Sequence, residues 1–170
     1  MNIKNYFKSV MGKNCYIAKG VNIKNGKLLA LGSNVSLRPN VEIFVGRGIS
    51  IGNGTDIGTR SRISCTNICK IGSNVLISPN VYITDCDHRY DMIEIPIISQ
   101  GVVEHENFVE IGDDSYLGIN SVLVGNIKIG KHVVVGANSV VTKNVPDFCV
   151  VAGVPAKVIK RYNIDIKDWI

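Results

Sequence analysis

Aliphatic residues recur along this chain with a period of six over most of residues 31–146. The next position is often Gly, the fourth is mostly Asn, Gly or Asp, and the fifth is usually small or β-branched. The aliphatic positions are Leu31, Leu37, Ile43, Ile51, Ile57, Ile63, Ile71, Ile77, Ile83, Ile111, Leu117, Leu123, Ile129, Val135 and Val141. Neither an α-helix nor a simple alternating strand has this period. It predicts a short strand with its aliphatic side chain inward, followed by a corner.

Three such hexads predict one triangular coil of 18 residues, with successive coils stacked like parallel strands about 4.8 Å apart. The repeat shifts by two residues after Ile43 and after Ile63, which predicts that the extra pairs 49–50 and 69–70 lie at corners. Asn and Gly suit corners because they tolerate the left-handed backbone conformation, and His132 at the same position is expected to be a surface corner residue. We therefore expect a single all-β solenoid domain over 1–170, with coils at about 13–88 and 111–146.

The repeat stops between His88 and Glu110, and segment 89–110 is expected to be a long inserted loop. Long loops in compact domains are usually functional. The His88 imidazole could remove a proton from a reacting hydroxyl at neutral pH, with Asp85, Asp87 or a backbone carbonyl holding the ring. From the residues alone, a surface polar cluster is an open alternative. His105 in the loop is expected to be solvated, with a substrate contact as its alternative.

Composition narrows the class of protein further. Hydrophobic residues make up 45% of the chain and charged residues 19%, which excludes a disordered, highly charged polymer. The net charge of +5 without a dense Lys/Arg run favours a small anionic ligand over nucleic acid. The five cysteines form no zinc-type set, and no stretch reaches the roughly 20 apolar residues of a membrane span. We expect a cytoplasmic protein without metal, nucleic-acid partner or transmembrane segment.

The run ISPNVYITDCDHRYD before the loop and the run VTKNVPDFCVVAGVPAKVIK near the C-terminus resemble the hexapeptide-repeat acyltransferases. The resemblance is greatest to the branch that acetylates saccharides and other small hydroxyl or amino compounds. It implies a left-handed parallel β-helix, a handedness that the spacing itself does not give. It also implies that His88 is the catalytic base, that acetyl-CoA is the co-substrate, and that a homotrimer forms its active sites between neighbouring chains.

The same resemblance places acetyl-CoA on the last coils. Its pantetheine arm would follow small residues at two corners, and basic residues would meet its phosphates. The implied cofactor positions are Tyr116, Gly118, Ile119, Gly136, Ala137, Thr142, Lys143, Lys157 and Lys160. Many relatives have Trp where this chain has Tyr116, and we expect the flat tyrosine ring to preserve the packing. Backbone N–H groups near Gly118 and Ile119 would stabilise the tetrahedral oxyanion.

These observations favour acetylation of a saccharide hydroxyl, in surface polysaccharide assembly, by direct attack on the thioester with His88 as general base. The first alternative is N-acetylation of an amino sugar or an antibiotic, and the second is a structural β-helix without turnover. A three-histidine zinc enzyme is disfavoured, since histidines 88, 105 and 132 lack the close spacing that such sites need. The segment 147–170 is expected to cap the last coil through a short helix or arm, with Trp169 packed against a neighbouring chain.

Overall fold

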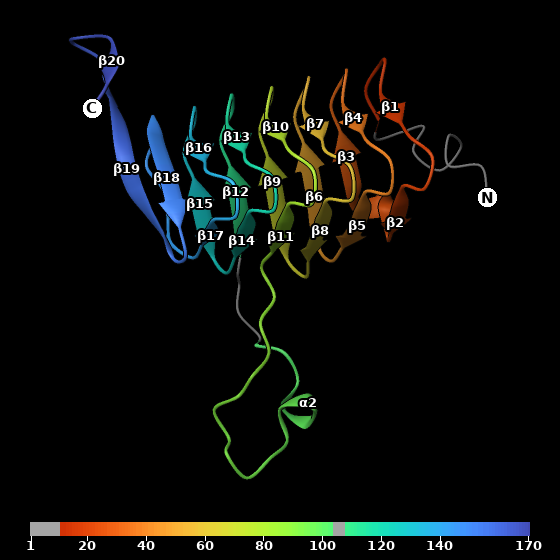
Figure 1. Ribbon diagram of the computed structural model, residues 1–170. Coiled ribbons are helices and arrows are strands. Elements are labelled where there is room, and N and C mark those ends of the chain that lie inside the picture. Colours follow the sequence, from red (N-terminus) through yellow and green to blue (C-terminus); the bar gives the residue numbers. More distant parts are fainter. Residues whose placement is uncertain (1–10, 104–107) are drawn as a thin grey trace.

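The computed structural model describes residues 11–103 and 108–170, and this part of the chain winds into a parallel β-solenoid (Figure 1). Its strands form three sheets, which are the faces of a triangular prism. Face 1 contains β1 (Tyr16–Ile17), β4 (Ser36–Leu37), β7 (Asp56–Ile57), β10 (Leu76–Ile77), β13 (Tyr116–Leu117), β16 (Val134–Val135), β18 (Cys149–Gly153), β19 (Ala156–Asn163) and β20 (Asp168–Trp169).

The other two faces are parallel throughout. Face 2 contains β2 (Asn22–Lys24), β5 (Glu42–Val45), β8 (Arg62–Cys65), β11 (Tyr82–Thr84), β14 (Val122–Val124) and β17 (Val140–Val141). Face 3 contains β3 (Leu29–Leu31), β6 (Gly48–Ile51), β9 (Ile68–Ile71), β12 (Phe108–Ile111) and β15 (Ile127–Ile129). A 3₁₀ turn, η1 (Gly26–Leu28), precedes β3. The predicted β-solenoid is therefore confirmed.

The core consists of the side chains that the hexad pattern directs inward. All fifteen aliphatic positions of the repeat are buried, with at most 4% of their surface exposed. The small fifth-position side chains, such as Val35, Thr55, Ser115 and Ser139, are at most 1% exposed. Each fully buried aliphatic side chain contributes about 1.5–3 kcal/mol relative to exposure. The repeat thus builds one continuous column of apolar side chains along the prism.

The corners adopt the left-handed backbone conformation that the fourth position predicts. Positive φ angles of 54–59° occur at Asn34, Asn40, Arg60, Asn74, Asn80, Asp114, Asn120, His132 and Asn138. His132 is exposed, which confirms it as a surface corner residue. Two sets of corners matter below. The glycine corner joins faces 1 and 2 through 38–41, 58–61, 78–81, 118–121 and 136–139. The loop corner lies between faces 2 and 3, and its described residues are 46–47, 66–67, 85–103, 125–126 and 142–144.

The extra residue pairs of the longer coils lie inside strands, and their predicted place at corners is wrong. Residues 49–50 belong to β6 and residues 69–70 belong to β9, while the chain turns at 46–47 and 66–67. Register partners are 20 residues apart in these coils, as between Asp56 and Leu76, and 18 apart between Tyr116 and Val134. The added residues lengthen the strands on both sides of the loop corner and bury Ile49 and Cys69.

The C-terminal segment forms an arm of antiparallel strands and contains no helix within residues 147–170. β19 pairs antiparallel with β18 across the end of face 1, and β20 folds back onto β19 (Figure 1). The expected cap thus takes the form of an arm, because the exposed edge of β18 offers free backbone groups to a returning strand. Trp169 contacts the Tyr162 ring in the same chain, edge to face at 5.4 Å.

Candidate functional site

The inserted loop leaves the solenoid at the loop corner, between β11 and β12, and projects away from it (Figure 1). Its two ends are joined by a short antiparallel bridge between His88 and Val102. The Arg89 N–H donates to the Gly101 carbonyl at 3.0 Å, and the Val103 N–H donates to the Asp87 carbonyl at 2.9 Å. These bonds fix the backbone of His88 at the neck of the loop.

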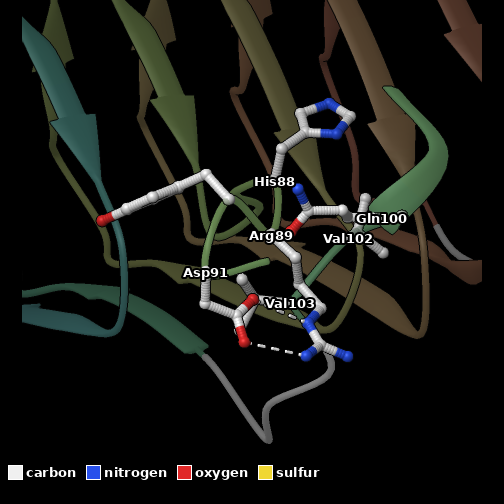
Figure 2. A pocket seen from close by; sticks show the side chains of 8 residues that line it. His88, Arg89, Asp91, Gln100, Val102 and Val103 are labelled. Carbon is white, nitrogen blue, oxygen red and sulfur yellow. Dashed lines mark hydrogen bonds and ion pairs between the residues drawn. The ribbon is translucent and has the colours of Figure 1, made fainter. Parts of the chain in front are cut away.

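The neck encloses a hollow of about 930 Å³ that is open to solvent. Its lining is His88, Arg89, Tyr90, Asp91 and residues 100–103. His88 is exposed, and its imidazole extends away from the Arg89–Asp91 ion pair (Figure 2). This ion pair has an N–O distance of 3.0 Å, and the guanidinium lowers the pKa of the Asp91 carboxyl. The hollow can therefore admit a polar acceptor to an accessible imidazole.

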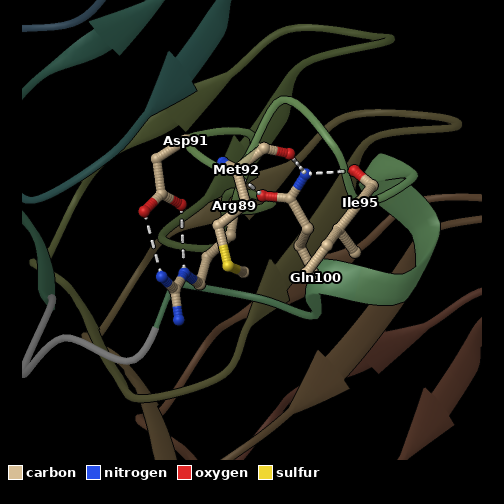
Figure 3. A network of polar contacts seen from close by, with 5 residues as sticks. All are labelled: Arg89, Asp91, Met92, Ile95 and Gln100. Atoms are coloured by element: carbon tan, nitrogen blue, oxygen red, sulfur yellow. Dashed lines mark hydrogen bonds and ion pairs between the residues drawn. The ribbon is translucent and has the colours of Figure 1, made fainter.

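Gln100 holds residues 92–100 of the inserted loop together, and no sequence motif marked it as a functional residue. It ends the short helix α2 (Ile97–Gln100) and is 9% exposed. Its side-chain oxygen accepts from the Met92 N–H at 3.1 Å, and its amide donates to the Met92 and Ile95 carbonyls at 2.8 and 2.7 Å (Figure 3). The only sequence signal was a polar residue before Gly101 at the end of an apolar run.

Asp85 is a buried residue whose carboxylate binds the backbone of the preceding coil. It is 1% exposed, and its carboxylate accepts from the Thr66 N–H at 2.7 Å, the Thr66 hydroxyl at 3.1 Å and the Asn67 N–H at 2.8 Å. These bonds hold the loop corner of the preceding coil. The exposed Asp87 accepts from the backbone N–H of His88 at 2.8 Å. Both carboxylates thus act on backbone groups, and the orientation of the His88 ring by either one stays a prediction.

Four of the implied cofactor positions lie at the glycine corner. Ile119 and Ala137 are exposed there, and Gly118 and Gly136 stack in successive coils. A Cβ on Gly118 would lie 2.6 Å from the Ala137 nitrogen, so coil stacking alone requires this glycine. The Gly118 N–H donates to the Val135 carbonyl at 2.8 Å, which makes it unsuitable as an oxyanion donor. Of the two amides proposed for that role, Ile119 is the candidate that remains.

The remaining implied cofactor positions lie elsewhere on the prism. Tyr116 is 36% exposed on face 1, and its hydroxyl accepts from the Ser78 hydroxyl at 3.1 Å. Thr142 and Lys143 are exposed at the loop corner of the last coil. Lys157 and Lys160 are exposed on β19, which pairs with β18 at the C-terminal end of face 1. One chain therefore presents the predicted cofactor residues in four separate places, counting the glycine corner.

His88 and the glycine corner are on opposite sides of face 2. The three residues of β14 that separate the two corners in one coil span about 10 Å, and each corner adds to this distance. A general base must come within about 3 Å of the proton it removes. The structure therefore does not bring His88 together with Gly118, Ile119, Gly136 and Ala137 within one chain.

In the described ranges, no group of three or more His, Cys, Asp or Glu side chains could hold a metal ion. The helices described in residues 11–103 and 108–170 are all too short or too polar to cross a bilayer. His105, expected to be solvated or to contact substrate, lies outside the described residues.

The comparisons with known proteins agree with this architecture. The family described as bacterial transferase hexapeptide (six repeats) matches residues 108–143. The chain is similar to the O-acetyl transferase WbbJ, assigned to lipopolysaccharide biosynthesis in Escherichia coli K12, with 40% identity over 58% of this chain and 53% of WbbJ. The solved galactoside acetyltransferase in complex with coenzyme A has 31% identity and a TM-score of 0.73, over 84% of this chain and 70% of that one.

A third similarity concerns the fold alone. AntD, an N-acyltransferase from Bacillus cereus solved with dTDP and 3-hydroxybutyryl-CoA, has 22% identity and a TM-score of 0.81 over 98% of this chain and 91% of AntD. The predicted left-handed parallel β-helix is thereby confirmed. The chain belongs to the hexapeptide-repeat family of bacterial acyltransferases. It spans about half of the length of WbbJ and less of other curated relatives.

Proposed function

We propose that this protein is an acetyl-CoA-dependent acetyltransferase that acetylates a saccharide hydroxyl. The observation that carries the proposal is the exposed His88 imidazole, whose backbone is held by a bridge at the neck of the inserted loop on the solenoid of this family. Galactoside acetyltransferase, at 31% identity, is named for a saccharide acceptor, and WbbJ, at 40% identity, is named for O-acetyl transfer in lipopolysaccharide biosynthesis. A role in surface polysaccharide assembly follows from the similarity to WbbJ.

His88 serves as general base in this proposal. It takes the proton of the acceptor hydroxyl while the hydroxyl oxygen forms a bond to the thioester carbonyl carbon. The carbon–sulfur bond then breaks, and the imidazolium returns its proton to the departing thiolate. The Ile119 N–H is the candidate donor to the oxyanion that forms between these two steps. The products are the acetyl ester and coenzyme A, and His88 regains its starting state.

The residues at the glycine corner and the C-terminal end fit acetyl-CoA chemically. The exposed Ile119 and Ala137 offer an apolar surface along which a narrow pantetheine arm can lie. The exposed lysines 143, 157 and 160 can neutralise its phosphates, and Tyr116 offers a partly exposed flat ring. When bound, acetyl-CoA supplies the activated acetyl group.

A homotrimer with parallel axes resolves the separation of these groups. If the glycine corner of one chain lies beside the loop corner of its neighbour, His88 of one chain and the cofactor path of another form one cleft. Threefold symmetry repeats that cleft three times, because each chain carries both corners. We therefore propose that each active site is built by two chains, in a cytoplasmic homotrimer.

The test measures acetyl transfer to a panel of saccharides. The release of the coenzyme A thiol gives the rate, and mass spectrometry identifies the product. We expect His88→Ala to lower turnover by at least about 100-fold, the lower range for loss of a general base, with little change in acetyl-CoA affinity. His132→Asn, which replaces a histidine remote from the loop, is the matched control and keeps full turnover. Near-normal turnover of His88→Ala would refute the role of His88.

Acetylation of an amine is the alternative. The chain is 50% identical over 34% of its length to a tetrahydropyridine dicarboxylate N-acetyltransferase of Clostridium perfringens. Acetylation of an amine would give an amide, whereas acetylation of a hydroxyl gives an ester. Treatment of the acetylated product with mild base separates the two, since only the ester is cleaved.

A further inference from the structure

A chain of side-chain hydrogen bonds runs along the glycine corner from Arg60 to Asn138. The Arg60 Nε–H group donates to the side-chain oxygen of Asn80 at 3.0 Å. The Asn80 amide donates to the side-chain oxygen of Asn120, and the Asn120 amide donates to that of Asn138, both at 3.1 Å. The four residues are exposed and belong to successive coils, so the chain of bonds spans three coil spacings, or about 14 Å. We call these four side chains the corner ladder.

The direction of the corner ladder is set at Arg60. A guanidinium group has only donors, so Asn80 turns its oxygen toward Arg60 and its NH₂ group toward the next coil. Each following amide is oriented in the same way, because it meets an NH₂ group and offers its oxygen to it. The last oxygen of the ladder, on Asn138, accepts from Asn120. The NH₂ group of Asn138 therefore points beyond the ladder, toward the C-terminal end of the solenoid.

Arg60 occupies a corner position whose backbone conformation favours other residues. Its φ angle is 58°, and most corner positions of the repeat carry Asn, Asp or Gly. A long side chain adopts this left-handed conformation at an energetic cost, whereas Asn adopts it readily. Backbone strain of this kind is concentrated at residues that have a functional role. The repeat alone therefore does not account for an arginine at the head of the corner ladder.

The free end of the corner ladder lies on the proposed cofactor path. Asn138 directly follows the exposed Ala137 in the glycine corner. In the part of the chain that the structure describes, no residue accepts a hydrogen bond from its NH₂ group. This group points toward the end of the prism at which β19 carries Lys157 and Lys160 (Figure 1). A cofactor whose phosphates meet these lysines and whose arm follows Ala137 would pass its amide carbonyls beside the Asn138 N–H donors.

We propose that Arg60 orients the corner ladder so that the Asn138 NH₂ group donates to a carbonyl oxygen of the acetyl-pantetheine arm. The inference rests on the proposed acetyltransferase function and adds a side-chain contact to its cofactor site. Asn138 is the binding residue, and Arg60 is a positioning residue that acts through the two asparagines between them. The ladder also strengthens its last donor, because hydrogen bonds in a chain polarise one another.

The first test measures acetyl-CoA binding to the full chain by calorimetry, with adenosine 3′,5′-bisphosphate as a probe that lacks the arm. Asn138→Gly removes the donor and suits the φ angle of 57° at this corner. We expect it to weaken acetyl-CoA binding about two- to tenfold, the range for one net hydrogen bond, and to leave binding of the bisphosphate unchanged. Asn34→Gly, at φ 59° on the corner between faces 3 and 1, is the matched control and should bind both probes normally.

Variants of Arg60 test the direction of the ladder. Arg60→Lys keeps a head group with only donors, so acetyl-CoA affinity should stay within about twofold of the original. Arg60→Asp places a carboxylate there, which has only acceptors, and Asp114 at φ 59° shows that Asp fits such a corner. Every amide then reverses, and Asn138 turns its oxygen toward the arm. We expect this variant to bind acetyl-CoA as weakly as Asn138→Gly, in about 0.5 M salt to screen the change of charge.

Acetyl-CoA affinity that is unchanged in Asn138→Gly, or that falls together with the affinity for the bisphosphate, would overturn the contact. So would a loss of affinity that light scattering traces to dissociation of the homotrimer. Normal affinity of Arg60→Asp beside weakened Asn138→Gly would overturn the role of Arg60. In these cases acetyl-CoA still binds the unmodified protein, and the acetyltransferase function stands. Absence of acetyl-CoA binding by the unmodified protein would instead refute the proposed function.

Discussion

Asp85 takes the position in its coil that Cys65 takes in the coil before, and it introduces a carboxylate into a column of buried apolar side chains. Thr84 pairs with Ser64 in the strand register, and Val45 pairs with Cys65 one coil earlier. The column therefore reads Val45, Cys65, Asp85. The carboxylate binds the backbone at Thr66 and Asn67 and thereby fixes the corner from which the loop departs.

Replacing Asp85 should mainly affect stability. Asp85→Ala removes the acceptor of the Thr66 and Asn67 N–H groups, and we expect the free energy of unfolding to fall by about 1–3 kcal/mol. Urea denaturation measures this change. Asp87→Ala, at an exposed position, should cost less than about 0.5 kcal/mol. Unchanged stability of Asp85→Ala with lost turnover would instead assign Asp85 to catalysis.

His132 tests the expectation that corner positions require residues that tolerate the left-handed backbone conformation. Its φ angle is 54°, a conformation that Asn adopts readily and a β-branched residue does not. His132→Asn should leave the free energy of unfolding within about 0.5 kcal/mol of the original, whereas His132→Val should lower it by about 1–2 kcal/mol. Thermal unfolding of the two variants checks the order. Equal stability would show that this corner relaxes to another conformation.

Gln100 is expected to position the loop without touching the reacting atoms. Gln100→Ala removes three hydrogen bonds to the Met92 and Ile95 backbone, and the freed residues 92–100 should hold the His88–Val102 bridge less firmly. We expect acceptor KM to rise and kcat to fall while acetyl-CoA affinity stays constant. Steady-state kinetics with both substrates varied measures this. Gln100→Glu would place a carboxylate oxygen against the Met92 and Ile95 carbonyls, so it should be impaired at least as much as Gln100→Ala. Normal kinetics of both variants would contradict the role.

The two-chain site predicts complementation between inactive variants. His88→Ala lacks the base, and Ala137→Glu places a charged side chain in the cofactor path of the glycine corner. Mixing the two after unfolding and reassembly should restore activity to about a quarter of the original, because one cleft in four would then combine two intact halves. The unmixed variants, carried through the same procedure, serve as controls. A mixture as inactive as its components would place the whole site in one chain.

The core could be predicted from the sequence because the aliphatic residue of each hexad marks the position that points inward. All fifteen of these residues are buried. The predicted place of residues 49–50 and 69–70 at corners was wrong because a six-residue period does not show which part of a longer coil holds its extra residues. The apolar alternation of Ile43 with Val45, and of Ile49 with Ile51, already indicated longer strands on both sides of the corner. The strand β19 could not be inferred from residues 156–163. Most of these residues are exposed, so no buried face gives them a hydrophobic alternation, and the strand forms because it pairs with the edge of β18.

The site was harder to predict than the fold because the role of each site residue depends on contacts with residues that are distant in the sequence. His88 stood out by its place before the loop, but nothing in the local sequence shows that Asp85 faces the corner at Thr66. The same holds for Gly118, which the repeat requires for stacking whether or not a cofactor passes it. The distance between the glycine corner and the loop corner becomes visible only when both are placed on the prism.

The central claim is that the protein is an acetyl-CoA-dependent acetyltransferase. Its most direct test is calorimetric titration of acetyl-CoA into protein whose oligomeric mass has been determined by light scattering. The account predicts saturable binding that Lys143→Ala combined with Lys160→Ala weakens by at least about fivefold, since two charge contacts to phosphate are lost. The paired control, Lys13→Ala with Lys19→Ala, alters exposed lysines at the opposite end of the solenoid and should bind normally. Absence of binding by a folded trimer would contradict the acetyltransferase function and favour a structural β-helix.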